Sequence, residues 1–404
     1  TSDVDMLWLV REMGLGGHLA WIPSRVGLYH GGRLWPFTTP GDLLRFRPLG
    51  LGDRLRLGLV SLYLQRLREW RRFEGVTAAG WLPPRVGQKA YEVVWEPLLR
   101  GKFGAHYAQV GMAWFWGKMA LRFASRGRLM AKEVLVYPLC SFGEVFDTLA
   151  ERVRERGGEV FTSAAVRRVA LRDGRAAGLE VDLPGQGTVV REFDALLCTT
   201  PSYILPRLVP ELPPSWVQQL TGVTYLAAVL IVLVLKRPLT RFYWLNIADR
   251  SIPFVGVVEH TNFIPPEHYG GKHLVYLSNY LGKESPLYHL PHGELLEVYL
   301  PHLRRLNPEF DLSWIESSSY HREDAAQPVI TADFGRRVPT HRTPVPGLYL
   351  ANTTQVYPED RGTNYSVRLG RKVARLILGD FGHRVEGDLP RPAIPTSVTV
   401  RMME

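Results

Sequence analysis

The stretch Gly347-Leu348-Tyr349-Leu350-Ala351-Asn352-Thr353, joined by residues 354–361 to Gly362-Thr363-Asn364-Tyr365-Ser366, decides the fold. Its short apolar run after Pro346 predicts a buried strand, and the second part opens a helix that reaches about Leu378. A helix N-terminus carries free N–H groups and a partial positive charge, which favour an anion or an electron-rich ring edge. The stretch therefore predicts a strand, a loop and a helix with a ligand site at the helix start. An ordinary strand-loop-helix at a domain edge is the alternative.

Periodicity within this helix separates small and apolar residues from basic ones. The predicted inner face consists of Val367, Gly370, Ala374 and Ile377, flanked by Leu369, Val373 and Leu376. The predicted outer face consists of Arg368, Arg371, Lys372 and Arg375. We expect the small residues to let the helix approach a neighbouring backbone closely.

The chain has 404 residues, of which 46% are hydrophobic, so it can form two domains or one elaborate domain with a real core. Its net charge is +10, and a basic surface suits an acidic small-molecule substrate, a phosphate-bearing cofactor or an anionic membrane surface. The basic residues are spread along the chain and no nucleic-acid-binding motif occurs, so we expect no nucleic-acid partner.

Cys140 and Cys198 are the only cysteines, without the spacing of a zinc site, so we expect no metal and a reducing cytoplasm. The chain begins Thr1-Ser2-Asp3, without the apolar segment of a secretory signal. Its longest apolar run, Tyr225 to Leu235, is too short to span a bilayer and predicts a core strand. The expected location is the cytoplasm, with contact to a membrane surface left open.

The first part of the chain shows a short amphipathic helix over residues 3–13, followed by Gly14-Leu15-Gly16-Gly17. A dinucleotide fingerprint needs a preceding strand, so these glycines predict a helix C-cap instead. Residues 29–37 predict a hairpin that turns at Gly31-Gly32. Its aromatic residues, Tyr29 and Trp35 among them, either line a substrate pocket or pack under the next segment.

Residues 42–128 predict mainly helices, and the part from Asp53 to Phe73 is rich in both leucine and arginine. A basic, leucine-rich helix can lie on a membrane surface. A solvated arginine face on an ordinary helix is the alternative, and the sequence does not decide between them.

The pattern changes at Tyr137. The pattern from there on predicts the interior of an α/β cofactor domain. It consists of a helix after Ser141, a short strand over residues 159–162, a three-stranded meander from Val166 to Arg191 and a buried strand over residues 193–198. Further strands are expected to form a mixed sheet covered by helices, including a helix over residues 292–306. They span residues 225–235, 242–247, 254–259, 273–279 and 314–321.

Polar residues at the ends of apolar strands are the candidates for a substrate site. Glu259, His260 and Asn262 end one predicted strand, and Arg322 follows another. Arg322 and Arg361 can bind a carboxylate or phosphate through their planar guanidinium groups. Local salt bridges and turns explain the same residues equally well. No nucleophile elbow, HExxH, Walker A or kinase motif occurs, so no catalytic residue is predicted.

In order, these elements resemble the flavin-containing amine oxidase superfamily, in its branch of protoporphyrinogen oxidase, phytoene desaturase and UDP-galactopyranose mutase. The resemblance rests on residues 137–150, Val166 and the meander, residues 195–201, and residues 347–374. It implies an α/β fold in which an FAD-binding Rossmann-like domain is interleaved with a mixed-sheet substrate domain and a helical subdomain. The expected divisions are 1–136 (hairpin and helical subdomain), 137–205 (cofactor domain), 206–340 (substrate domain), 341–380 (cofactor domain) and 381–404 (loose tail).

The resemblance also implies FAD as cofactor, with the last helix N-terminus against the flavin and Val166 binding the adenine portion through its backbone. The expected cofactor-binding residues are Val166, Asn352, Thr353, Arg361, Gly362, Thr363, Asn364 and Tyr365.

Three features depart from the family pattern. The usual first strand with GxGxxG is lacking, so the chain is expected to begin downstream of that βα unit. Asn352-Thr353 replaces a usual Gly-Asp pair, and Cys140-Ser141 replaces a Gly-Gly pair.

The leading hypothesis is an FAD-dependent oxidoreductase that takes hydride from a small organic or lipid-like substrate. The residues expected to line its substrate pocket are Tyr29, Trp35, Glu259, His260, Asn262 and Arg322. A flavin-dependent mutase acting on a nucleotide sugar is one alternative, in which Arg322 and Arg361 grip a diphosphate. A fragment that cannot hold FAD is another. The substrate, the electron acceptor and the oligomeric state remain open.

Overall fold

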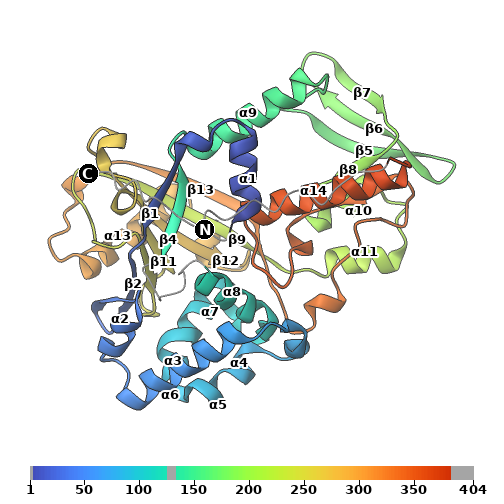
Figure 1. Cartoon of the computed structure of the whole chain (residues 1–404). Coiled ribbons are helices and arrows are strands. Elements are labelled where there is room, and N and C mark those ends of the chain that lie inside the picture. The colour runs from blue at the N-terminus through green and yellow to red at the C-terminus, as the bar shows by residue number, and fades with distance from the viewer. Residues whose placement is uncertain (1–2, 125–132, 384–404) are drawn as a thin grey trace. The chain divides into compact units, whose positions relative to one another are not determined.

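The structure, a computed structural model, describes residues 3–124 and 133–383 (Figure 1). For residues 121–124 it describes the backbone and not the side chains. The expected tail lies outside the described residues from residue 384 onward. The chain divides into two compact units, each built from separate segments. Unit 1 comprises residues 1–21, 136–224 and 336–404, and unit 2 comprises residues 22–135 and 225–335. Within the described ranges, no helix is both long enough and apolar enough to cross a bilayer.

Unit 1 is a mixed α/β unit whose longest helix is the predicted C-terminal one. Its helices are α1 (Val4–Glu12), α9 (Ser141–Glu155), α10 (Leu205–Leu208), α11 (Pro214–Thr221) and α14 (Thr363–Asp380). Its strands are β5 (Ala165–Arg172), β6 (Arg175–Leu183), β7 (Gly187–Glu192), β8 (Leu196–Cys198) and β14 (Leu348–Leu350). A further pair, β1 (Leu19–Pro23) and β4 (Val134–Pro138), forms a two-stranded sheet.

The predicted meander and buried strands of unit 1 are confirmed. β5, β6 and β7 form an antiparallel sheet, while β14 lies parallel to β8 with Leu348 opposite Leu196. The strand expected over residues 159–162 is wrong: these residues are exposed and form no strand. An apolar run becomes a strand only where another strand takes up its backbone hydrogen bonds, and the described residues bring none beside it.

Helix α14 forms as predicted, but its packing differs from the expectation. Leu369, Val373 and Leu376 pack with Tyr349 and Ala351 at the strand β14. The two small residues expected to meet a neighbouring backbone, Gly370 and Ala374, are instead exposed. The helix is therefore fixed by its large apolar residues, and the close approach predicted from the small ones is not observed.

Unit 2 is organised around a seven-stranded mixed sheet in the order β13-β9-β12-β11-β10-β2-β3. The strands are β2 (Val26–His30), β3 (Arg33–Pro36), β9 (Tyr225–Leu235), β10 (Trp244–Ile247), β11 (Gly256–Glu259), β12 (His273–Leu281) and β13 (Ile315–Pro328). Along β9 buried and half-buried residues alternate, and helix α13 (His292–Leu306) covers the buried face. Both the core strand and this helix are confirmed, whereas β13 continues beyond the predicted end and includes Arg322.

The hairpin and the glycine cluster also behave as predicted. β2 and β3 are antiparallel, and Gly31 and Gly32 turn between them with φ of 60° and 72°, a region that favours glycine. Gly14, with φ of 78°, ends α1 and donates to the Arg11 carbonyl.

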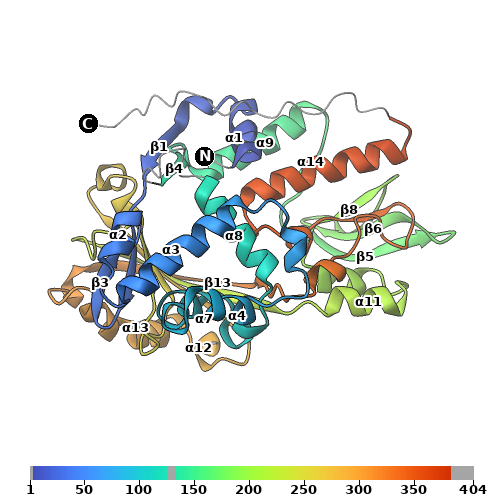
Figure 2. The same ribbon diagram turned by 60° about the horizontal axis from the view of Figure 1, so that its bottom comes forward.

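The helical part of unit 2 contains short and medium helices (Figure 2). They are α2 (Pro40–Arg45), α3 (Leu51–Arg66), α4 (Ala78–Trp81), α5 (Pro83–Val86), α6 (Gln88–Ala90), α7 (Glu96–Phe103) and α8 (Met112–Ala124), with a π-helical turn at Tyr91–Trp95 and a short α12 (Pro286–His289) elsewhere.

Candidate cofactor site

The loop after β14 is held by one buried amide. Asn352 donates from Nδ2 to the Thr200 carbonyl (2.9 Å) and to Ser202 Oγ (3.1 Å). Its Oδ1 accepts from the backbone N–H of Thr354 (3.1 Å) and from the Thr354 hydroxyl. These contacts use the full hydrogen-bonding capacity of the amide. Asn352 therefore joins the C-terminal ends of β14 and β8 and leaves no polar atom over for a ligand.

The N-terminus of α14 is open to a ligand. Gly362 occupies the N-cap without a side chain to accept a hydrogen bond, while its carbonyl accepts from Tyr365 and Ser366. The backbone N–H groups of Thr363 and Asn364 have no partner in the described part of the chain. Helix geometry leaves such first-turn donors free, and the helix dipole adds a partial positive charge there. This end of α14 is suited to an electron-rich or anionic group.

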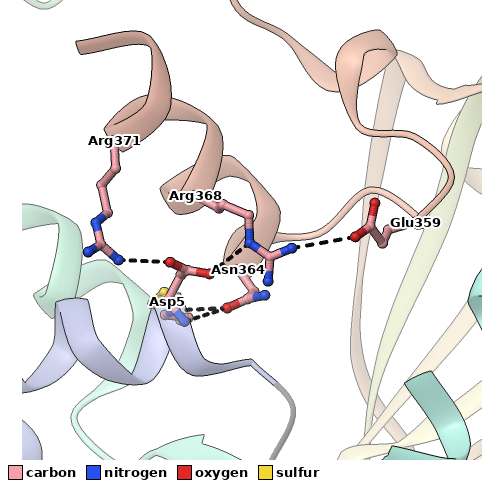
Figure 3. Close-up of polar contacts among 6 residues, drawn as sticks. Asp5, Glu359, Asn364, Arg368 and Arg371 are labelled. Carbon is pink, nitrogen blue, oxygen red and sulfur yellow. Dashed lines mark hydrogen bonds and ion pairs between the residues drawn. The ribbon is translucent and has the colours of Figure 1, made fainter. Parts of the chain in front are cut away.

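Asn364 connects this helix end with the start of α1 (Figure 3). Its Oδ1 accepts from the backbone N–H groups of Asp5 (2.9 Å) and Met6 (3.0 Å), so it caps α1 from a distant part of the sequence. Asp3, the N-cap residue of α1, makes no such bond. The Nδ2 of Asn364 is buried and has no hydrogen-bond partner among the described residues. A buried donor without an acceptor is costly, so it is a candidate ligand contact.

A partly buried ion-pair cluster lies beside this amide. Asp5 accepts from Arg368 (2.9 Å) and Arg371 (2.8 Å), and Arg368 also lies 3.4 Å from Glu359 (Figure 3). Arg371 additionally covers the Trp8 ring at 4.1 Å. Arg368 and Arg371 belong to the predicted outer face of α14, and α1 packs against this helix.

Sequence reasoning missed this cluster, although a signal exists. Asn364, Arg368 and Arg371 are spaced by four and three residues and so share one helix face. Asp5 stands four residues before Leu9 and is buried with it on α1. An acid on an apolar face requires a partner, and a basic face elsewhere can supply it.

The other predicted cofactor residues also lie in unit 1. Val166 is on β5, 38% exposed and opposite Val181. Tyr365 is buried beneath the Arg368 guanidinium, 5.1 Å from its ring, and burial raises the pKa of its phenol. Thr353 and Arg361 are half-buried in the segment between β14 and α14. The structure thus brings residues 352–365 together, while Val166 belongs to the meander.

On the substrate side, Glu259 and Asn262 come together around one turn of unit 2. The Glu259 carboxylate accepts from the backbone N–H groups of Leu239 (2.9 Å) and Thr240 (2.6 Å) and from the Thr240 hydroxyl (2.9 Å). Asn262 donates to the carbonyls of Thr240 and Phe242, both at 2.9 Å. Burial raises the pKa of Glu259 to about 7. These two side chains hold residues 239–242 in place.

His260 is buried next to them, with Nε2 2.6 Å from the Tyr269 hydroxyl, and burial lowers its pKa. The three other predicted substrate residues lie on separate strands. Tyr29 is 1% exposed in the core of the sheet, and Trp35 donates to the His30 carbonyl. Arg322 donates to the Tyr288 carbonyl (3.1 Å) and covers the Tyr288 ring.

The sheet order separates Arg322 from Trp35. They lie on the edge strands β13 and β3, six strand spacings apart. At about 4.8 Å per spacing the path across the sheet is roughly 29 Å. One small substrate therefore does not meet both residues along this sheet. Among residues 3–124 and 133–383, no cluster of histidine, cysteine and acidic side chains could hold a metal ion.

Comparison with known proteins identifies the family. The family described as flavin-containing amine oxidoreductase matches residues 6–378. The comparison with curated proteins finds no match. Among solved structures, a putative protoporphyrinogen oxidase from Exiguobacterium sp. 255-15 aligns with a TM-score of 0.71 at 18% identity, covering 93% of this chain and 85% of the other.

Two further structures show the same fold. Reduced UDP-galactopyranose mutase aligns with a TM-score of 0.68 at 16% identity, covering 97% of this chain and 84% of the other. Putrescine oxidase bound to putrescine aligns with a TM-score of 0.65 at 15% identity, covering 93% of this chain and 86% of the other. The resemblance inferred from the sequence is confirmed. The chain belongs to the flavin-containing amine oxidoreductase family and is an FAD-dependent oxidoreductase.

Proposed function

We propose that this oxidoreductase takes hydride from a C–H bond of a small organic substrate, including the C–H bond of a carbon that bears an amine nitrogen, with the flavin end of FAD held at the N-terminus of α14. The backbone N–H groups of Thr363 and Asn364 and the side chain of Asn364 would be its contacts in unit 1. Val166 would contact the adenine portion through its backbone, as the family resemblance implies.

The observation that carries this proposal is the buried Nδ2 of Asn364, which has no acceptor among the described residues. Its own oxygen is already committed to α1, so the amide cannot turn over without losing two hydrogen bonds. An electron-rich ring edge at the helix start would accept from this donor and from the free backbone donors beside it.

The contribution of the chain itself would be orientation and electrostatics. FAD, when bound, supplies the hydride-accepting chemistry. Tyr365 remains a neutral phenol because burial raises its pKa, and it closes the helix start on the side of Arg368. The Asp5 cluster fixes α1 and thereby the orientation of Asn364. Glu259 and Asn262 would act in unit 2 by holding residues 239–242. No side chain is assigned as a general base.

The test is the affinity of the purified full chain for FAD, measured by the flavin absorption bands and by quenching of flavin fluorescence. Asn364→Asp keeps the oxygen that caps α1 and replaces only the donor. We expect it to weaken FAD binding about tenfold or more, the cost of one lost hydrogen bond and of a carboxylate facing an electron-rich group. Circular dichroism should show an unchanged fold.

The matched control is Asn246→Asp. Asn246 is a half-buried residue of β10 whose side-chain oxygen accepts from Trp244, and this variant should bind FAD like the wild type. Equal affinity of Asn364→Asp and the control would contradict the proposed contact. Isomerisation of a nucleotide sugar by the reduced protein, without net electron transfer, would contradict the proposed oxidation.

A further inference from the structure

Helix α3 of unit 2 carries an uncovered apolar stripe. Leu51, Leu55, Leu59 and Tyr63 follow one another at intervals of four residues, so they share one face of the helix. Their exposures are 67%, 58%, 67% and 46%, and Leu44 at the end of α2 is 52% exposed. We call these five residues the α3 stripe. It extends for about 18 Å along the helix, since twelve residues each rise about 1.5 Å.

The stripe is additional to the face that packs the helix into unit 2. Leu57 and Leu64, each 2% exposed, point to the opposite side, where Trp116 donates to the Leu64 carbonyl. A helix of a soluble domain ordinarily buries one apolar stripe and presents polar residues on the other side. α3 has two apolar faces, and the leucines of the second one stay exposed, while Tyr63 at its end stacks on the Trp81 ring with 6.5 Å between the ring centroids. A contiguous exposed apolar face of this kind marks an interaction surface.

The stripe is held rigidly at both sides. Arg54 donates to the carbonyls of Leu49 (2.7 Å) and Leu44 (2.6 Å), which ties α3 to the end of α2 and to the segment after it. Arg56 donates to the carbonyls of Pro84 and Arg85. Because these bonds fix α3 against its neighbours, the leucines cannot turn inward without breaking them.

The charge around the stripe is strongly positive. Residues 44–73 contain eight arginines against Asp53 and Glu69. Five exposed arginines make no ion pair with any residue that the structure describes: Arg45, Arg47, Arg66, Arg68 and Arg72. Their charges are therefore available to an external anionic partner.

We propose that the α3 stripe binds the surface of an anionic lipid membrane, with the leucines among the acyl chains and the arginines at the headgroups. Leucines on one face of a helix, with exposed arginines just before it, at its end and just after it in the sequence (the arginine rim), form the arrangement of an interfacial helix. The helix has 16 residues and several arginines, so it lies in the plane of the membrane surface and does not cross the bilayer. Figure 2 shows α3 along its length, on the helical part of unit 2.

A second copy of the chain is a poorer occupant for electrostatic reasons. A two-fold contact through the stripe would place the arginine rim of one copy against the same rim of the other. Like charges facing each other across an interface are unfavourable. Anionic headgroups, by contrast, meet both the leucines and the arginines of this surface.

The experiment is co-sedimentation of the full chain with vesicles of phosphatidylcholine alone and of phosphatidylcholine with phosphatidylglycerol at about three to one. We expect binding to the anionic vesicles only, weakened by added salt because salt screens charges near the surface. Leu55→Ser combined with Leu59→Ser should lower the partition coefficient at least about tenfold. Leu312→Ser, at an isolated leucine of unit 2 that is 57% exposed, should have no effect.

Arg68→Gln combined with Arg72→Gln tests the charge and should lower binding roughly tenfold or more, since each arginine near such a surface contributes about fivefold. Arg154→Gln combined with Arg156→Gln removes the same charge from exposed positions of unit 1 and should leave binding unchanged. Hydrogen exchange of α3 should slow only when anionic vesicles are present. Equal binding of stripe and control variants would overturn the proposal. So would a dimer that protects α3 without lipid.

Discussion

Glu259 shows how one buried carboxylate can make stability depend on pH. It is fully buried at the end of β11, and its oxygens accept from three donors of residues 239–240. Burial raises its pKa from 4.5 to about 7, while the hydrogen bonds act in the opposite direction. In the unfolded chain the same group ionises near its ordinary pKa. Between these two values the folded protein holds a proton that the unfolded chain has released.

This residue predicts a loss of stability as pH rises. The contribution of Glu259 to the free energy of unfolding is fully present below pH 4.5 and is lost as the pH rises through about 7. The total loss is about 3 kcal/mol. Glu259→Gln cannot ionise, so the difference in unfolding free energy between wild type and variant should change over this interval and be constant outside it. Urea unfolding at a series of pH values measures this difference. A difference that is independent of pH would show that Glu259 does not titrate there.

At the residue scale, sequence identifies unusual positions better than it identifies their partners. Glu259 and Asn262 stand out as polar residues at the end of an apolar strand. Their partners at residues 239–242 are some twenty positions away and have no local pattern that marks them. Asn364 stands at the predicted helix start, but its bond to the start of α1 joins distant parts of the chain, which no local pattern reveals. Such pairings are decided by tertiary packing and are not visible in periodicity.

At the scale of elements, α1 and α14 depend on each other. Asn364 caps α1, and Asp5 of α1 forms ion pairs with two arginines of α14. The side chain of Asp5 is 12% exposed and that of Arg371 is 16% exposed, so this pair is screened less than a surface ion pair. Removing one partner of a largely buried pair leaves the other charge without compensation.

Asp5→Asn tests this dependence. We expect the variant to lose about 1–3 kcal/mol of stability, less than for a fully buried pair because Arg368 is half-exposed. Hydrogen exchange should show faster opening of α1 and of the first turn of α14. The matched control is Asp182→Asn, which breaks an exposed pair with Arg167 on the meander and should have a much smaller effect. Equal effects of the two variants would contradict the importance of the partly buried cluster around Asp5.

Element types were largely predictable, because periodicity reports which face of a segment is buried. The meander, the core strand β9 and the helix α13 all follow from local patterns of apolar residues. The strand expected over residues 159–162 fails because strand formation needs a neighbour. The expected packing of Gly370 and Ala374 fails for a related reason. Small residues permit a close approach, but only large ones such as Val373 drive it.

At the scale of the whole molecule, the two units differ in how their cores are built. The sheet of unit 2 and helix α13 share one continuous hydrophobic cluster. Within the described part of unit 1, buried apolar residues form smaller clusters, among them those around Val169, Val10 and Val373. Because apolar burial is the dominant stabilising contribution, we expect unit 1 to be the less stable of the two.

Calorimetric unfolding of the full chain should therefore show two transitions, with unit 1 unfolding first. All residues proposed to contact FAD lie in unit 1. A ligand that binds only the folded form stabilises it by about 2.7 kcal/mol at a hundredfold excess over its dissociation constant. Added FAD should therefore raise the midpoint temperature of the first transition and leave that of the second unchanged. Hydrogen exchange during heating would assign each transition to residues, with α14 opening in the first and β9 in the second. Because ligand binding acts only on the unit that holds the ligand, a shift of the second transition alone would contradict this placement of the cofactor.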